Sequence, residues 1–232
     1  MLNGIFAGGA AAEEGLAKGQ KKTIVFDPGH GGYDIGVKGS DGTFEKTVTL
    51  TLARIIEEAL EKKHRVHLTR TDDYGIDITE RTAVANHLKS DLFISIHTGG
   101  SNVRKLSGIS VFCFSEKWDP VLKPETGPLK PAEGGGARIS WDQIQNGHKA
   151  ASGTLASRIG ARLADQFKFT EVRLQGAPIL VLEGADMPAV LIEIGYLTNP
   201  TDEKKLMDRN VLRNFAQAVS GGIDDFFMNQ IN

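Results

Sequence analysis

The sequence lacks the features of a disulfide-rich scaffold, a membrane protein or a nucleic-acid-binding protein. Its one cysteine, Cys113, excludes a disulfide within these 232 residues and lies in an apolar run that predicts a buried, unreactive thiol. No apolar run approaches the roughly 20 residues that a membrane-spanning helix needs. With 27 basic and 29 acidic residues the formal charge is −2, so we expect neither nucleic acid nor an anionic membrane as a partner.

The first residues also lack the marks of an export signal. Residues 1–12 are small and mildly apolar, without the positively charged start and long apolar core of a signal peptide. Residues 1–22 are rich in Gly, Ala, Lys and Glu, and we expect a flexible lead-in there. The remainder, 23–232, is long enough for one domain with a generous core.

What the sequence does contain is an alternation of short β-branched runs and amphipathic stretches. Such alternation is typical of a parallel sheet covered by helices. We therefore predict the α/β class, as a single domain with a largely parallel twisted sheet and helices on both faces. The expected strands are residues 23–27, 65–69, 91–97, 108–115, 178–183 and 189–193, and the expected helices are 47–62, 79–89, 148–168, a short one opening at 199–202, and 211–228.

Residues 116–147 interrupt this alternation. Four of the eight prolines fall between Pro120 and Pro131, and three glycines follow at 134–136. A loop of this length inside a compact domain is usually functional or disordered. We expect an inserted Pro/Gly-rich loop, with a helix only near Trp141.

Polar residues with metal-binding or acid–base chemistry follow three of the predicted strands. His30 comes after the first strand and a Gly-rich turn, His97 directly after an apolar run, and Glu193 directly after another. In an open α/β sheet the carboxyl ends of such strands gather in one crevice. Two imidazoles and a carboxylate make a three-ligand zinc site with an open fourth position, and a second carboxylate can act as base. The pattern therefore predicts metal-assisted hydrolysis.

Simpler roles exist for each of these residues. His97 would also suit a hydrogen-bonded position at a strand end, and Glu193 a salt bridge to Arg70 or Arg81. A phosphate-binding loop at residues 27–32 is disfavoured, because no helix follows the glycines directly. Burial would raise the pKa of Glu193 towards neutrality, as a general acid/base requires. Glu183 is its rival for that role.

The other polar candidates are weaker. Arg81 and Asn86 lie on the expected helix 79–89, where we assign them capping or packing roles. The remaining histidines occupy ordinary structural or exposed positions: His64, His67, His87 and His148.

Four blocks in order give the chain a specific resemblance. They are IVFDPGHGG from Ile24, Glu45 with the helix behind it, LTRTDD and ERTAVANHLKSDLFISI ending before His97, and PAVLIEIGYLTNP from Pro188. Over residues 23–228 the chain resembles the zinc-dependent N-acetylmuramoyl-L-alanine amidases of bacterial cell walls. The departures are Thr98-Gly99-Gly100 after the strand histidine, where a small residue and Asn are usual, and Tyr196 in place of Phe.

The resemblance implies a residue set and a reaction. It implies that His30, Glu45 and His97 bind one Zn²⁺ ion and that Glu193 is the catalytic acid/base; the choice of Glu45 over other acids rests mainly on it. The implied reaction is hydrolysis of the amide between N-acetylmuramic acid and L-alanine of the peptidoglycan stem peptide. Alternatives are a carboxypeptidase on the same scaffold and a wall-binding module without catalysis.

The resemblance also bears on partners and location. It implies peptidoglycan as substrate and a cell-envelope location, periplasmic or extracellular. Some relatives carry, where this chain has 116–147, an inserted helix that blocks the zinc site until an activator protein removes it. An activator is therefore one expected partner, although the Pro/Gly-rich composition favours a lid or a substrate-contacting loop over autoinhibition. We expect the protein to be a monomer.

Overall fold

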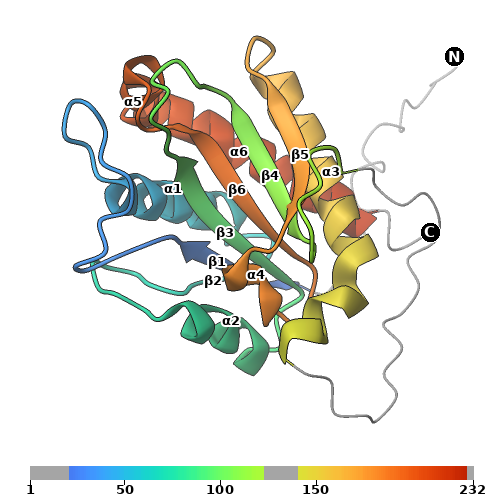
Figure 1. The fold of residues 1–232 in the computed structure, drawn as a ribbon. Helices are drawn as coiled ribbons and strands as arrows, with labels where there is room; N and C mark the ends of the chain where they lie inside the picture. The colour runs from blue at the N-terminus through green and yellow to red at the C-terminus, as the bar shows by residue number, and fades with distance from the viewer. Residues whose placement is uncertain (1–20, 123–140, 229–232) are drawn as a thin grey trace, which may run out of the picture.

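Six strands form one sheet in the order β2-β1-β3-β6-β4-β5, in a computed structural model that describes residues 21–122 and 141–228 (Figure 1). All neighbouring strands are parallel except β4 and β6, which are antiparallel. The predicted α/β class and largely parallel sheet are confirmed. The strands are β1 Thr23–Pro28, β2 Arg65–Leu68, β3 Leu92–Gly99, β4 Ile109–Phe114, β5 Val172–Ala177 and β6 Ala189–Tyr196.

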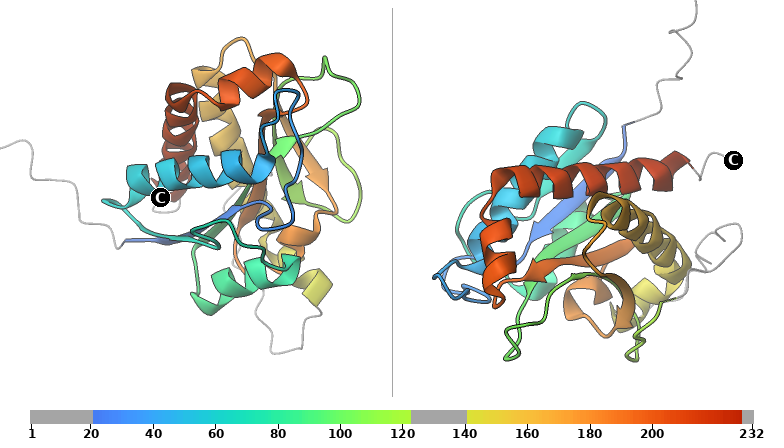
Figure 2. Two further views of the ribbon diagram at one scale, coloured as in Figure 1. Left: turned by 90° about the vertical axis from the view of Figure 1, so that its left-hand side faces the viewer. Right: turned by 90° about the horizontal axis from the view of Figure 1, so that it is seen from above.

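Helices cover both faces of the sheet, but unequally. Figure 2 shows α1, α3 and α6 on one side and the short α2 on the other. None of the helices in the described residues is long and apolar enough to cross a membrane. The helices are α1 Glu45–Leu60, α2 Ile78–His87, α3 Lys149–Gln166, α4 Leu180–Glu183, α5 Pro200–Leu206 and α6 Arg209–Met228, with a 3-10 helix η1 at Trp141–His148.

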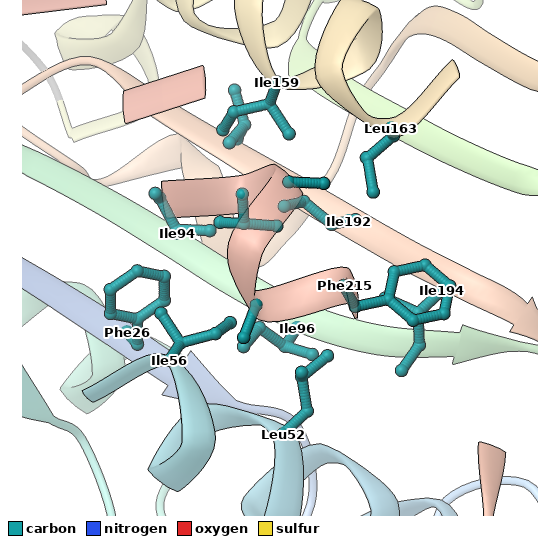
Figure 3. Close-up of a cluster of buried hydrophobic side chains, with 14 of the residues drawn as sticks. Phe26, Leu52, Ile56, Ile94, Ile96, Ile159, Leu163, Ile192, Ile194 and Phe215 are labelled. Carbon is teal, nitrogen blue, oxygen red and sulfur yellow. The ribbon is translucent and has the colours of Figure 1, made fainter. Parts of the chain in front are cut away.

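The larger core lies between the sheet and the long helices (Figure 3). Alternate residues of a strand point to opposite faces, so Ile94 and Ile96 of β3 and Ile192 of β6 meet α1, α3 and α6 on this side. A smaller cluster on the other face includes Phe93 of β3 and Leu191 of β6, packed with α2 and α4. By the same alternation, His97 and Glu193 share this second face, which is therefore the one that carries the candidate site.

One predicted strand is wrong. The fifth strand is Val172–Ala177, and the predicted strand at 178–183 contains helix α4 instead. Pro178 has no N–H to continue the ladder, and a four-residue apolar run does not distinguish a strand from a buried helical turn. The true strand lies at the edge of the sheet and is only half-buried over its first three residues, so its apolar signal is weak.

Two other expectations concern the middle of the chain. The predicted burial of Cys113 is confirmed, and burial raises the pKa of its thiol to about 12. The expected insertion at 116–147 keeps a helix near Trp141, namely η1. Residues 123–140 lie outside the described residues, so the lid stays a prediction. Residues 1–20, which make up most of the expected flexible lead-in, also lie outside the described residues.

Candidate metal centre

His30 lies in the loop after β1, in an unusual backbone conformation. The Gly29 N–H donates to the Ile96 carbonyl (2.9 Å), which extends the β1–β3 pairing to the residue before His30. His30 itself has a φ of 64°, a left-handed conformation that is uncommon for a non-glycine residue and frequent at functional sites. The turn aims the imidazole at Glu45, whose Oε2 lies 3.1 Å from Nε2.

Glu45, the first residue of α1, is the centre of the group. It is 1% exposed, and its carboxylate accepts the backbone N–H groups of Val37 and Thr98, both at 2.8 Å. Its Oε1 lies 3.1 Å from Nδ1 of His97. Burial opposes ionisation, but hydrogen bonds from His30 and His97 and their charges hold the pKa of Glu45 well below its usual value. These contacts therefore favour the ionised form of Glu45.

His97, on β3, completes the set. Its ring meets that of His30 edge to face, with centroids 4.9 Å apart, and one donor atom from each of His30, Glu45 and His97 lies within 4.8 Å of the others. The approach depends on Gly29, where a Cβ would come within 2.4 Å of the His97 ring. Two imidazole nitrogens and a carboxylate oxygen at these separations form a donor set that suits Zn²⁺. The structure therefore brings together the three predicted ligands.

Glu193, on β6, is the register partner of His97 and is partly buried. Among the described residues, no N–H or O–H donates a hydrogen bond to its carboxylate. Burial raises the pKa of Glu193; the His97 and Arg173 charges oppose this shift and the Glu45 charge adds to it. The expected direction of the shift is confirmed.

The simpler role for Glu193, a salt bridge to Arg70 or Arg81, is wrong. Arg81 pairs with the buried Asp27 (2.8 Å) and donates to the carbonyls of Pro28 and His30, both at 3.1 Å. Its predicted packing role is confirmed. Asn86 likewise packs, because it donates to the Gly184 carbonyl at 2.8 Å. The rival acid Glu183 ends α4 instead of a strand.

Arg70 was not predicted to support the site. Its side chain is fully buried and donates to the carbonyls of Pro28 (2.9 Å), Gly29 (2.8 Å) and Lys46 (2.8 Å). It thereby connects the loop that carries His30 to the first turn of α1, which begins at Glu45. A buried guanidinium that donates to backbone carbonyls of both segments fixes the relative position of these two ligand-bearing segments.

Asp34 is a second residue that the sequence interpretation missed. Its Oδ2 lies 2.8 Å from Nδ1 of His30, the ring nitrogen that faces away from Glu45, and its Oδ1 accepts the Gly36 N–H at 3.1 Å. Carboxylates in this position orient metal-binding histidines. Burial lowers the pKa of His30, but Glu45 and Asp34 outweigh it and raise that pKa. In the sequence, the four-residue spacing between His30 and Asp34 was the signal that could have indicated this contact.

A hollow of about 960 Å³ opens beside the two imidazoles. It is lined by His30, His97 and the segments 31–34, 73–78 and 179–181. Other histidines lie elsewhere: His64 beside Asp224, and His148 beside Asp186. His30 and His97 therefore face a space large enough for a substrate.

Comparison with known proteins gives a consistent result. The model of the N-acetylmuramoyl-L-alanine amidase family matches residues 24–225. N-acetylmuramoyl-L-alanine amidase AmiA of Salmonella typhimurium is 30% identical over 224 residues, which cover 90% of this chain and 77% of that protein. A probable cell wall amidase, LytH of Staphylococcus epidermidis, is 29% identical over 209 residues, covering 89% of this chain and 58% of LytH.

Solved structures agree on the fold. The catalytic domain of CwlV, an N-acetylmuramoyl-L-alanine amidase from Bacillus (Paenibacillus) polymyxa var. colistinus, superposes with a TM-score of 0.70 and 28% identity. That match covers 89% of this chain and 98% of the CwlV domain. The CwlD amidase of Clostridioides difficile, solved in complex with the GerS lipoprotein, has the same fold, with a TM-score of 0.70, 24% identity and coverage of 90% of this chain and 99% of CwlD.

Proposed function

The chain belongs to the N-acetylmuramoyl-L-alanine amidase family, and from that premise we propose that it is a zinc-dependent hydrolase of peptidoglycan. The bond cleaved is the amide between the lactyl group of N-acetylmuramic acid and L-alanine of the stem peptide. The catalytic domain is residues 23–232. The observation that carries the proposal is the convergence of donor atoms from His30, Glu45 and His97 within 4.8 Å.

His30, Glu45 and His97 would hold the metal ion. The donor set fits zinc, because it offers three protein ligands and leaves a coordination position for substrate or water. When bound there, zinc supplies Lewis-acid chemistry, polarising a carbonyl group and acidifying water. Asp34 holds the His30 ring in orientation, and the N–H groups of Val37 and Thr98 hold the Glu45 carboxylate.

Glu193 carries the proton. Its carboxylate takes a proton from the attacking water and delivers it to the nitrogen of L-alanine as the amide C–N bond breaks. The absence of hydrogen-bond donors to Glu193 among the described residues supports this role, because a carboxylate that is not already stabilised as an anion exchanges a proton readily. The register pairing of Glu193 with His97 supports this role.

Metal analysis and product identification test the proposal together. We expect one zinc per purified chain, loss of activity on chelation and recovery when zinc is restored. Mass spectrometry of digested muropeptides should find stem peptides with a free N-terminal L-alanine. Release of C-terminal residues from the stem peptide would instead support a carboxypeptidase, and binding to the wall without turnover in the presence of zinc would support a binding module.

The proposed substrate also sets the expected surroundings. Peptidoglycan lies in the cell envelope, so the protein acts there. One structural neighbour was solved with a lipoprotein partner, GerS. We likewise propose that a protein activator acts on this chain through the 116–147 segment.

A further inference from the structure

Large apolar side chains stand exposed around the hollow beside His30 and His97. Tyr33 is 106% exposed, Leu180 65%, Tyr74 46% and Ile78 45%, and all four line this hollow. Single exposed apolar residues are ordinary on protein surfaces. Several around one concave space mark a ligand-binding surface.

The two sides of the lining differ: one carries aromatic and charged side chains with Ile76 and Ile78 among them, and the other is wholly aliphatic. Tyr33, Asp73, Tyr74 and Asp77 combine aromatic faces with carboxylates, and we call these four residues the tyrosine wall. The other part, Ile179–Val181 at the start of α4, is aliphatic. A substrate that joins a sugar to a peptide would meet a different surface on each side of the bond that is cleaved.

Resting on the proposed function, we propose that the tyrosine wall binds the glycan strand and that the stem peptide extends along the aliphatic part. A pyranose ring presents C–H groups that stack on an aromatic face and hydroxyl groups that donate to carboxylates. Aromatic side chains with a polar tip suit such an amphipathic partner.

The two halves of the substrate also differ in charge. The glycan is neutral where its lactyl groups are amide-linked, whereas the stem peptide carries free carboxylates. Asp73 of the wall is paired with Lys46 at 2.7 Å, but Asp77 has no ion-pair partner among the described residues. The Asp77 carboxylate, which makes no capping hydrogen bond to α2, is therefore available to accept a sugar hydroxyl.

The wall is rigidly connected to the proposed metal ligands. The Gly32 N–H donates to Asp73 at 2.8 Å, and Lys46 bridges the Gly32 carbonyl and Asp73 at 2.8 and 2.7 Å. Gly31 passes so close that a Cβ would lie 2.2 Å from the Tyr74 carbonyl oxygen. A sugar stacked on Tyr74 would thus be held at a fixed distance from His30, as hydrolysis of one particular bond requires.

A second hollow extends the surface for a polymer. It has a volume of about 630 Å³ and shares Tyr74, Gly75 and Ile76 with the first. Its other lining residues belong to α2 and the residue after it, and they include Val84 and His87. Residues 74–76 therefore stand between two hollows, with room for further sugar units beyond the one at the cleaved bond.

The first test measures binding of a peptide-free sugar. The probe is a tetramer of N-acetylglucosamine, titrated into the intact zinc-loaded protein and followed by NMR. We expect saturable binding that Tyr74→Ala weakens about tenfold, the scale of one lost aromatic contact, and that Tyr74→Phe retains. The matched control is Phe169→Ala, because Phe169 is 104% exposed but lines neither hollow. Absence of tetramer binding, or equal losses in Tyr74→Ala and Phe169→Ala, would overturn the proposal.

The second test separates glycan binding from hydrolysis. Tyr74→Ala should raise KM on glycan chains bearing stem peptides while kcat changes little, and should have a much smaller effect on a single muramyl peptide. Equal losses on both substrates would contradict a glycan-binding wall. If the wild type cleaves muramyl peptides but does not bind the tetramer, this inference fails and the proposed function stands. If it cleaves neither substrate, the proposed function itself fails.

Discussion

The start of α1 and the end of β6 each bring a glutamate to the same site, in opposite electrostatic states. Glu45 is 1% exposed and accepts two backbone N–H groups, and both histidines face it. Glu193 is partly buried with no hydrogen-bond donor among the described residues. The pKa of Glu45 is held well below its usual value, whereas burial raises the pKa of Glu193.

This difference shows that burial alone does not decide the chemistry of a carboxylate. The donors that surround Glu45 favour its ionised form, which suits the binding of a cation. Their absence at Glu193 leaves a group that can take up and release a proton. Pairs of acids whose surroundings drive their pKa values apart are how sites divide such roles.

The largest effect should come from exchanging each acid for its amide. We expect Glu193→Gln to lower kcat by about 100- to 10,000-fold with zinc content unchanged, because only the proposed proton carrier is lost. Glu45→Gln should lower zinc content and activity together. Activity assays paired with metal analysis decide between the two. Loss of zinc from Glu193→Gln would make Glu193 a ligand and break the comparison.

The buried contacts of Arg81, which hold the loop that carries His30, should matter for stability. Arg81→Met leaves Asp27 as a buried unpaired charge and releases the His30 carbonyl. We expect a loss of about 3–5 kcal/mol in the free energy of unfolding, measured with urea. Arg162→Met removes an exposed ion pair with Asp225 and should cost far less. Similar losses in both variants would argue against a supporting role for Arg81.

A smaller effect should follow at Asp34. Asp34→Asn weakens the contact that orients the His30 ring, and loss of such a contact typically lowers metal affinity about 10- to 100-fold. Competition with a chromogenic chelator measures zinc affinity without reference to activity. Asp41→Asn is a suitable control, because Asp41 lies in the same loop region and its backbone N–H, which the substitution keeps, donates to Glu203. Unchanged zinc affinity in Asp34→Asn would show that the ring is held without it.

The smallest effect concerns stability against pH in the metal-free protein. The pKa of Glu193 is raised above its usual 4.5, so its ionisation destabilises the fold as pH rises beyond that value. The pKa of Glu45 is lowered, so its stabilisation is present above pH 4.5 and is lost as pH falls. We expect Glu193→Gln to be more stable than the wild type at pH 7, with the gain vanishing below pH 4.5.

Glu45→Gln should show the opposite behaviour. It should be less stable than the wild type at pH 7, and the difference should shrink in acid. Urea unfolding of the wild type and both variants at pH 7 and pH 4 gives the stability difference of each variant at each pH. Changes of the same sign in the two variants would contradict the assignment of opposite states.

The sequence predicted those parts of the site that depend on strand ends. His97 and Glu193 end apolar runs, and parallel pairing brings them side by side, as expected. The helix at Glu45 was likewise visible from its apolar spacing. These features are readable because alternation and helical periodicity reflect burial over many residues, so that no single position decides them.

The missed features depend on single contacts in loops. Asp34 and Arg70 act through hydrogen bonds whose geometry is set only once the 28–36 loop has folded against α1. The left-handed conformation of His30 is equally invisible, because non-glycine residues seldom adopt it. At β5 the edge position weakened the apolar signal, and the stronger run after Pro178 belongs to α4.

The pairing of β3 with β6 has one irregularity just beyond the site. His97 lies opposite Glu193 but Gly99 lies opposite Tyr196, so β6 accommodates an extra residue at Gly195, whose φ is 128°. The polar pair therefore sits at the last position before the phase of β6 changes. An insertion or deletion of one residue between Ala189 and Glu193 would turn the carboxylate towards the long helices and present an isoleucine to the histidines. The proposed chemistry therefore depends on the spacing along β6 as much as on the identity of the acid.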